Sequence, residues 1–156
     1  METNQTVIEV LNDLVKINND RITGYEKASD EATDSDIDLK GMFRKMANDS
    51  RENVRELSEL IEKSGGDVAT DTTLPGKIYR AWMDVKSAFT GSDRKGILSS
   101  CEYGEDAAQK AYETALKSDA EIDAESRQLI MSQKSSLKES HDMIKKYRDL
   151  HEVAAH

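Results

Sequence analysis

Apolar residues recur every three or four positions along four long stretches of this chain, and this periodicity restricts the fold more than any other feature. Three stretches cover residues 4–32, 93–117 and 123–151; the other begins after Ser35 and ends before the Gly65-Gly66 pair. The chain has one proline, which lies outside all four stretches, so nothing in them breaks a helix. The spacing predicts four helices of about 25 to 29 residues, each about 40 Å long.

The connections between these stretches predict how the helices are arranged. The first and second stretches are joined by a tight link, as are the third and fourth, so each pair forms an antiparallel hairpin. The link at residues 65–92 is long, and a short helix opened by Pro75 is expected within it. Such a link lets the chain run the length of the bundle, so that the third helix starts from the opposite end to the one where the second helix stops. We therefore expect one all-α domain over residues 1–156, a four-helix bundle with a helix-containing crossover.

Charge and cysteine content exclude several classes of partner. The net charge of −9 disfavours nucleic acid, which needs a clustered basic face, and adsorption to anionic lipid. No stretch approaches 18 apolar residues, so no membrane span is expected, and the N-terminal residues do not read as a signal peptide. Cys101 is the only cysteine, which excludes an intrachain disulfide and favours a cytoplasmic location.

Polar residues interrupt the apolar faces of the four helices near their middles. The interrupting residues are Asn18, Ser50, Asn53, Glu105 and His141. A buried carboxylate must be paired, hydrogen-bonded or protonated, so Glu105 is expected to meet a partner in a buried polar layer. Protonated His141 is one candidate partner, and the amide and hydroxyl groups of the layer are others. Gln133 also faces inward but lies away from the middle, and Glu105 at the edge of the core is the remaining alternative.

A weak internal repeat relates the two halves of the chain. The segment NNDRITGYEKA, which begins at Asn18, aligns with EDAAQKAYETA, which begins at Glu105, and the two share Tyr, Glu and Ala near their ends. Glu105 follows Asn18 by 87 positions, and His141 follows Asn53 by 88. Two nearly equal offsets indicate two related helical hairpins.

The segments INNDRITGYEKAS, RENVRELSELIEKSGGD, CEYGEDAAQKAYETAL and SHDMIKKYRDL resemble a bacterial family of ferritin-like four-helix bundles whose function is uncharacterised. In di-iron members of the ferritin-like class, two helices each give a Glu and two each give Glu-x-x-His. Carried over by position, these ligands fall at Asn18, Ser50, Asn53, Glu105, Lys138 and His141. Only Glu105 and His141 keep side chains that bind metals, which is too few for two cations. The resemblance therefore implies a ferritin-like fold with a degenerate di-iron site.

The favoured function is therefore non-enzymatic: a ferritin-like structural or interaction module, stress-associated by analogy, that forms a homo-oligomer, with a dimer as the first expectation. No catalytic residues and no cofactor are expected. The alternative is a metal-binding or iron-oxidising protein that holds iron or another divalent metal through Glu105 and His141. In the crossover, Trp82 and the apolar residues near it either cover the bundle or form a subunit contact.

Overall fold

In the computed structural model of the 156-residue chain, residues 2–31, 37–70, 94–118 and 120–155 are described here. These residues form four α-helices and no β-strand: α1 (Glu2–Glu31), α2 (Ile37–Lys63), α4 (Arg94–Lys117) and α5 (Ala124–Ala155). The all-α prediction is confirmed, and each predicted stretch corresponds to one helix. Ser35, after which the second helix was expected to begin, and the expected helix that opens at Pro75, with Trp82, lie outside the described residues.

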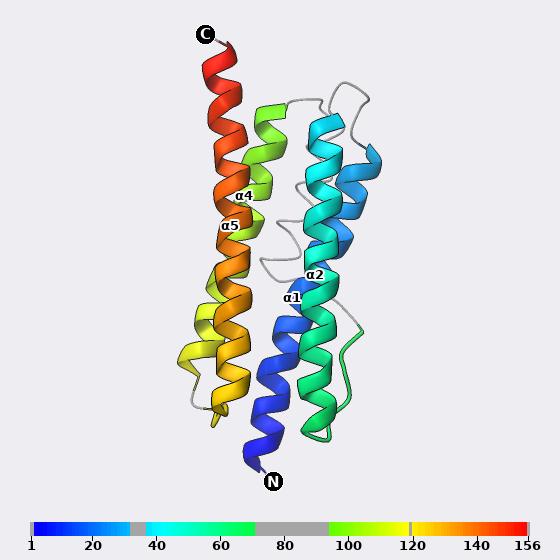
Figure 1. Ribbon diagram of the computed structural model, residues 1–156, viewed down its shortest axis with the longest axis vertical. Helices are drawn as coiled ribbons and strands as arrows, with labels where there is room; N and C mark the ends of the chain where they lie inside the picture. The colour runs from blue at the N-terminus through cyan, green and yellow to red at the C-terminus, as the bar shows by residue number, and fades with distance from the viewer. Residues whose placement is uncertain (1, 32–36, 71–93, 119, 156) are drawn as a thin grey trace.

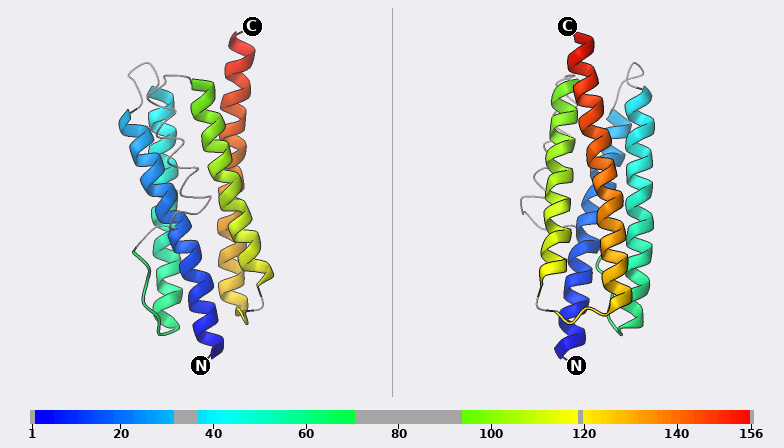
Figure 2. Two further views of the ribbon diagram at one scale, coloured as in Figure 1. Left: turned by 180° about the vertical axis from the view of Figure 1, so that it is seen from behind. Right: turned by 60° about the vertical axis from the view of Figure 1, so that its left-hand side comes forward.

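The four helices lie side by side with their long axes roughly aligned (Figures 1 and 2). Helices α1 and α2 form one antiparallel hairpin, and α4 and α5 form the other. Between the hairpins, α1 packs against α4, and α2 touches α5 more lightly. In Figure 1, α1 and α5 run upward, whereas α2 and α4 both run downward. Two successive long helices, α2 and α4, therefore share a direction.

Helix α2 ends at the predicted glycine pair. Gly65 has a φ of 85°, in the left-handed region, and the Gly66 amide donates to the Ile61 carbonyl at 2.9 Å. This arrangement satisfies carbonyl groups that the helix end leaves without a partner. The next residues are fastened to α1, because the Asn12 side chain donates to the Asp67 carbonyl at 2.9 Å and accepts from the Ala69 amide at 2.8 Å.

Replacing Gly65 by alanine should therefore lower the free energy of unfolding by about 1–2 kcal/mol, the cost of a left-handed L-residue. A Cβ at Gly65 meets no atom within 4 Å, so backbone strain alone would produce the loss. Gly41 is the matched control: it lies inside α2, a Cβ there is also in open space, and Gly41→Ala should raise stability by about 0.5–1 kcal/mol. Urea denaturation measures the change in the free energy of unfolding of both variants. Changes of the same sign at the two glycines would contradict this prediction.

The buried apolar side chains form two separate clusters along the bundle. The first cluster comprises Tyr25, Ala28, Leu39, Met42, Phe43, Met46, Ala47, Leu98, Cys101 and Ile144. The second cluster comprises Val7, Leu11, Leu14, Val15, Ile17, Leu57, Leu60, Ile61, Ala108, Tyr112, Ala115, Ala120, Ile130 and Leu137. On each of the four helices, buried polar residues lie at the change from one cluster to the other. The buried polar residues of the four helices therefore separate the two apolar clusters.

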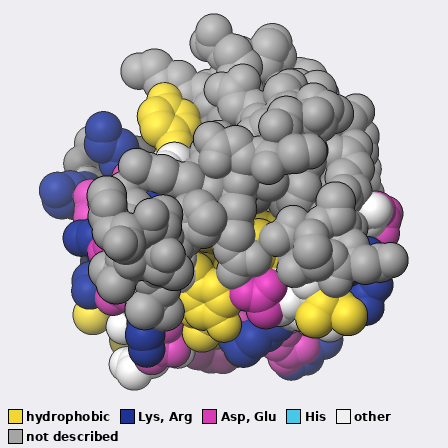
Figure 3. Space-filling model, turned by 90° about the horizontal axis from the view of Figure 1, so that it is seen from above, with side chains coloured by type: hydrophobic (Ala, Val, Ile, Leu, Met, Phe, Trp, Pro, Cys, Tyr) yellow, Lys and Arg dark blue, Asp and Glu magenta, His cyan; other side chains and the backbone are white. Residues whose placement is uncertain are grey.

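Charged side chains surround the described part of the bundle. The end-on view in Figure 3 shows acidic and basic groups interspersed around the described rim, with hydrophobic side chains between them. Several form ion pairs, such as Lys63 with Glu125, which joins α2 to α5 at 3.1 Å. Among the described helices, none has a stretch apolar and long enough to span a bilayer.

Candidate functional site

A buried ion pair occupies the middle of the bundle. Arg21 on α1 donates to Glu105 Oε1 on α4 through Nη2 at 2.7 Å and through Nε at 3.2 Å. Both side chains are fully buried. Tyr25 donates its hydroxyl to the same oxygen at 2.5 Å, and the third guanidinium nitrogen of Arg21, Nη1, donates to Ser50 on α2. Three helices thus meet at one ion pair.

The surroundings of Arg21 keep its guanidinium charged. Burial acts to lower the pKa of Arg21, but the neighbouring Glu105 carboxylate, and then the charge of the Tyr25 hydroxyl group, raise it by more. The net pKa lies above its ordinary value. The guanidinium carbon also lies 5.4 Å from the centre of the Tyr25 ring, within the range of a cation–π contact. The layer therefore contains a permanent positive charge.

Neutral groups form the other half of the layer. Asn18 donates to the Tyr112 hydroxyl at 2.8 Å and accepts from Asn53 at 3.1 Å. Tyr112 donates to Gln133 Oε1 at 2.7 Å, which links α4 to α5. Gln133 then donates to the Asn53 carbonyl at 3.2 Å and to Glu56 at 3.3 Å. All four helices are joined through hydrogen-bonded side chains, as expected for buried polar groups.

The two hairpins bury equivalent positions with a constant offset of 87 residues. Tyr25 and Tyr112 are one such pair, and Asn18 and Glu105 are another. The contacts between them are reciprocal, because Tyr25 donates to Glu105 while Tyr112 accepts from Asn18. The buried pairs with this offset include Leu11/Leu98, Leu14/Cys101, Asn18/Glu105, Arg21/Ala108, Tyr25/Tyr112, Ala28/Ala115, Leu39/Ser126, Phe43/Ile130, Met46/Gln133, Ser50/Leu137, Asn53/Ser140 and Leu57/Ile144. The hairpins are therefore structurally related.

The constant offset corrects the sequence alignment of the fourth helix. Ser140, not His141, is the equivalent of Asn53, and Ser140 is buried. The inner face of α5 runs through Gln133, Leu137, Ser140 and Ile144, in steps of three and four residues. A residue that follows Ser140 directly is rotated off this face.

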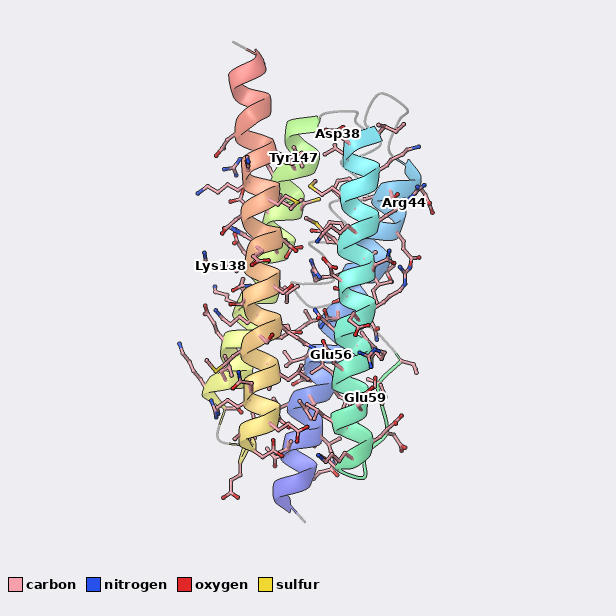
Figure 4. All side chains as sticks on the ribbon, viewed as in Figure 1. Asp38, Arg44, Glu56, Glu59, Lys138 and Tyr147 are labelled. Carbon is pink, nitrogen blue, oxygen red and sulfur yellow. The ribbon has the colours of Figure 1, made fainter. Side chains whose placement is uncertain are left out.

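His141 was therefore wrongly expected in the buried layer. Its imidazole lies between α5 and α4, where Nε2 is 2.7 Å from Asp106 Oδ1 and 3.8 Å from Glu102 Oε1. Lys138, the other carried-over ligand position on this helix, is 68% exposed and points outward (Figure 4). The structure does not bring Glu105 and His141 together.

The other predicted layer residues are all buried. Asn18, Ser50 and Glu105 are fully buried, and Asn53 is 7% exposed. Gln133 was expected to lie away from them, yet it is hydrogen-bonded to Tyr112 and to the Asn53 backbone. Arg21 was missed entirely. Its position was readable, because it lies three residues after Asn18 and four before Tyr25, both on the inner face.

Iron, which the resemblance to di-iron proteins implies, does not fit this set of residues. Glu105 Oε1 already accepts three hydrogen bonds, and the positive charge of Arg21 beside it repels any cation. Asn18 and Ser50, which stand at ligand positions, are neutral. Glu105 Oε2 receives no hydrogen bond from any described residue, but one oxygen cannot supply the several ligands that a protein metal centre needs.

The fold and this site define a helical protein whose core is divided by a charged and hydrogen-bonded layer. Residues 6–118 match the model of a family described as a domain of unknown function, DUF2383, and the chain belongs to that family. The match includes α1, α2 and α4, and so includes Arg21 and Glu105. No curated protein matches the chain.

Proposed function

We propose that this protein is a ferritin-like four-helix bundle. An internal ion pair stands where the di-iron members of the ferritin-like class hold two iron ions. The protein acts without catalysis, as a structural or interaction module. The directions of the helices support the fold. A bundle in which the second and third long helices share a direction needs a long crossover between its hairpins, as in ferritin-like proteins.

The ligand positions support the loss of the metal centre. With the offset of 87 residues, the Glu-x-x-His positions fall at Ser50 and Asn53 on α2, and at Leu137 and Ser140 on α5. Of the six ligand positions, Glu105 alone keeps a metal-binding side chain. The observation that carries the proposal is the 2.7 Å contact between Arg21 Nη2 and Glu105 Oε1, because it neutralises that carboxylate with a fixed cation.

We propose that the protein acts through its surface. Apolar side chains exposed on the second hairpin include Tyr103 on α4, 57% exposed, and Met131 on α5, 56% exposed. We propose that the chain is cytoplasmic and associates with itself, with a dimer as the first expectation. Nucleic acid is disfavoured by the net charge of −9. Light scattering at several protein concentrations tests the association, and a monomer at all of them would contradict it.

Iron chemistry provides the direct test of the proposed function. The purified chain should oxidise added Fe²⁺ no faster than buffer, as followed by absorbance, and should hold no pair of iron ions in elemental analysis. Glu105→Gln is the control, because it removes the one remaining ligand charge from the core. Two iron ions per chain in the native protein, lost in Glu105→Gln, would overturn the proposal.

A further inference from the structure

We propose that Glu102, Asp106 and His141 form a binding site for a single divalent first-row transition cation on the outer side of the α4–α5 hairpin. The site is separate from the polar layer and goes beyond the proposed function. Glu102 and Asp106 are four residues apart on α4, so they share a face of the helix, and His141 meets them from α5. One ligand atom from each residue lies within 4.8 Å of the other two.

The spacing of these atoms suits one small cation. Ligands in a tetrahedral site with metal–ligand bonds of about 2.0–2.1 Å lie about 3.3 Å from each other. His141 Nε2 is 2.7 Å from Asp106 Oδ1 and 3.8 Å from Glu102 Oε1, so the two separations bracket that value. The ligand oxygens of Glu102 and Asp106 lie within 4.8 Å of each other, so side-chain rotation closes the three atoms around one ion and leaves the fourth position for water.

Neighbouring groups orient the ligands. Asp142 Oδ1 lies 3.2 Å from His141 Nδ1, where it is placed to accept the Nδ1–H of the tautomer whose Nε2 would bind the cation. Lys138 holds the other oxygen of Asp142 at 3.3 Å. Arg148 binds Glu102 through Oε2, and so leaves Oε1 facing the histidine. This arrangement matches the carboxylate–histidine–metal arrangement of known metal sites.

Burial and charge favour the same occupant. The side chains of Glu102 and His141 are 18% and 19% exposed, whereas Asp106 is 62% exposed and gives an ion access from solvent. The carboxylates of Glu102 and Asp106 bring two negative charges to the site, which Arg148 offsets in part. One nitrogen and two oxygen ligands favour Zn²⁺, Mn²⁺ or Fe²⁺ over Ca²⁺ and Mg²⁺, which prefer oxygen alone.

Calorimetric titration of the chelator-treated full chain with ZnCl₂ tests the site. We expect one Zn²⁺ per chain, binding weakened at least about tenfold in His141→Ala, a smaller weakening in Asp142→Asn, and no comparable heat with CaCl₂. The chain has three histidines, so the double variant His151→Ala, His156→Ala is the matched control and should bind as the native chain does. Circular dichroism spectra of all variants verify that each is folded.

Three outcomes overturn the site. No saturable Zn²⁺ binding by the native chain would mean that His141 and Asp106 form an ordinary ion pair. Binding that is unchanged in His141→Ala but lost in the double control variant would assign the metal to those other histidines. Metal that depends on Glu105 and not on His141 would overturn the proposed function as well, so the failures of the two proposals are distinguishable.

Discussion

Replacing Arg21 by methionine is expected to lower the free energy of unfolding by about 3–5 kcal/mol, the usual cost of breaking a buried ion pair by removing one partner. The variant leaves Glu105 fully buried with the Tyr25 hydroxyl as its one remaining described donor. The carboxylate must then take up a proton or draw water into the core. Urea denaturation followed by circular dichroism measures the loss, which is large beside the whole stability of a domain, about 5–15 kcal/mol.

Two further variants separate the charge effect from packing. The double variant Arg21→Met, Glu105→Met removes both partners. Its free energy of unfolding should return to that of the native chain or exceed it, because neither charged group then has to be removed from water. Arg55 is the matched surface control: it pairs with Glu52 and Glu59 but is 57% exposed, so Arg55→Met should change stability by less than about 1 kcal/mol. A loss in Arg21→Met no greater than in Arg55→Met would contradict the interpretation of the layer.

Stability should fall steeply in alkaline solution. Burial, and then the nearby Glu105 carboxylate, raise the pKa of the Tyr25 hydroxyl well above its usual value and raise the pKa of the Cys101 thiol. Burial likewise raises the pKa of Tyr112, although its hydrogen bond from Asn18 acts in the opposite direction. The unfolded chain therefore loses these protons first, the thiol near pH about 8.5 and the phenols near pH about 10.

The sign of the dependence follows from proton counts. Above these unfolded pKa values the folded state binds more protons than the unfolded state, so stability decreases as pH rises. Each group contributes about 1.4 kcal/mol per pH unit, hence about 4 kcal/mol per unit once all three titrate in the unfolded chain. Denaturation midpoints between pH 8 and 12 measure the slope. Tyr112→Phe should reduce the slope by about a third, and a stability that stays flat to pH 12 would contradict the expected burial of these groups.

The helices and their bounds followed from the sequence because their cause is local. Apolar spacing, the shortage of proline and the Gly65 stop act within a few residues of chain, and the structure has a helix at each predicted stretch. The burial of Glu105 was also predictable, since the apolar residues on either side of it on α4 fix its direction. Which groups it meets depends on how four separate helices pack.

The errors in the predicted site have physical causes. His141 was placed inward because α5 carries few apolar residues, so a rotation of one position was difficult to detect. The true inner face of α5 includes three polar residues, Ser126, Gln133 and Ser140. Arg21 was passed over because arginine is rarely buried without a partner, and the partner lies 84 positions away in sequence. A carboxylate on an apolar face should prompt a search for a cation on the equivalent faces of the other helices.

The constant offset between the hairpins bears on how charge can be arranged at such a centre. If two separate identical hairpins paired, each central position would carry the same residue twice, and anion would face anion unless metal ions or protons intervened. Joining both hairpins in one polypeptide removes that restriction. Position 18 can carry an amide where position 105 carries an acid, and position 21 an arginine where position 108 carries alanine. The charge of Glu105 is then balanced by Arg21 of the same chain, because the two hairpins are free to differ.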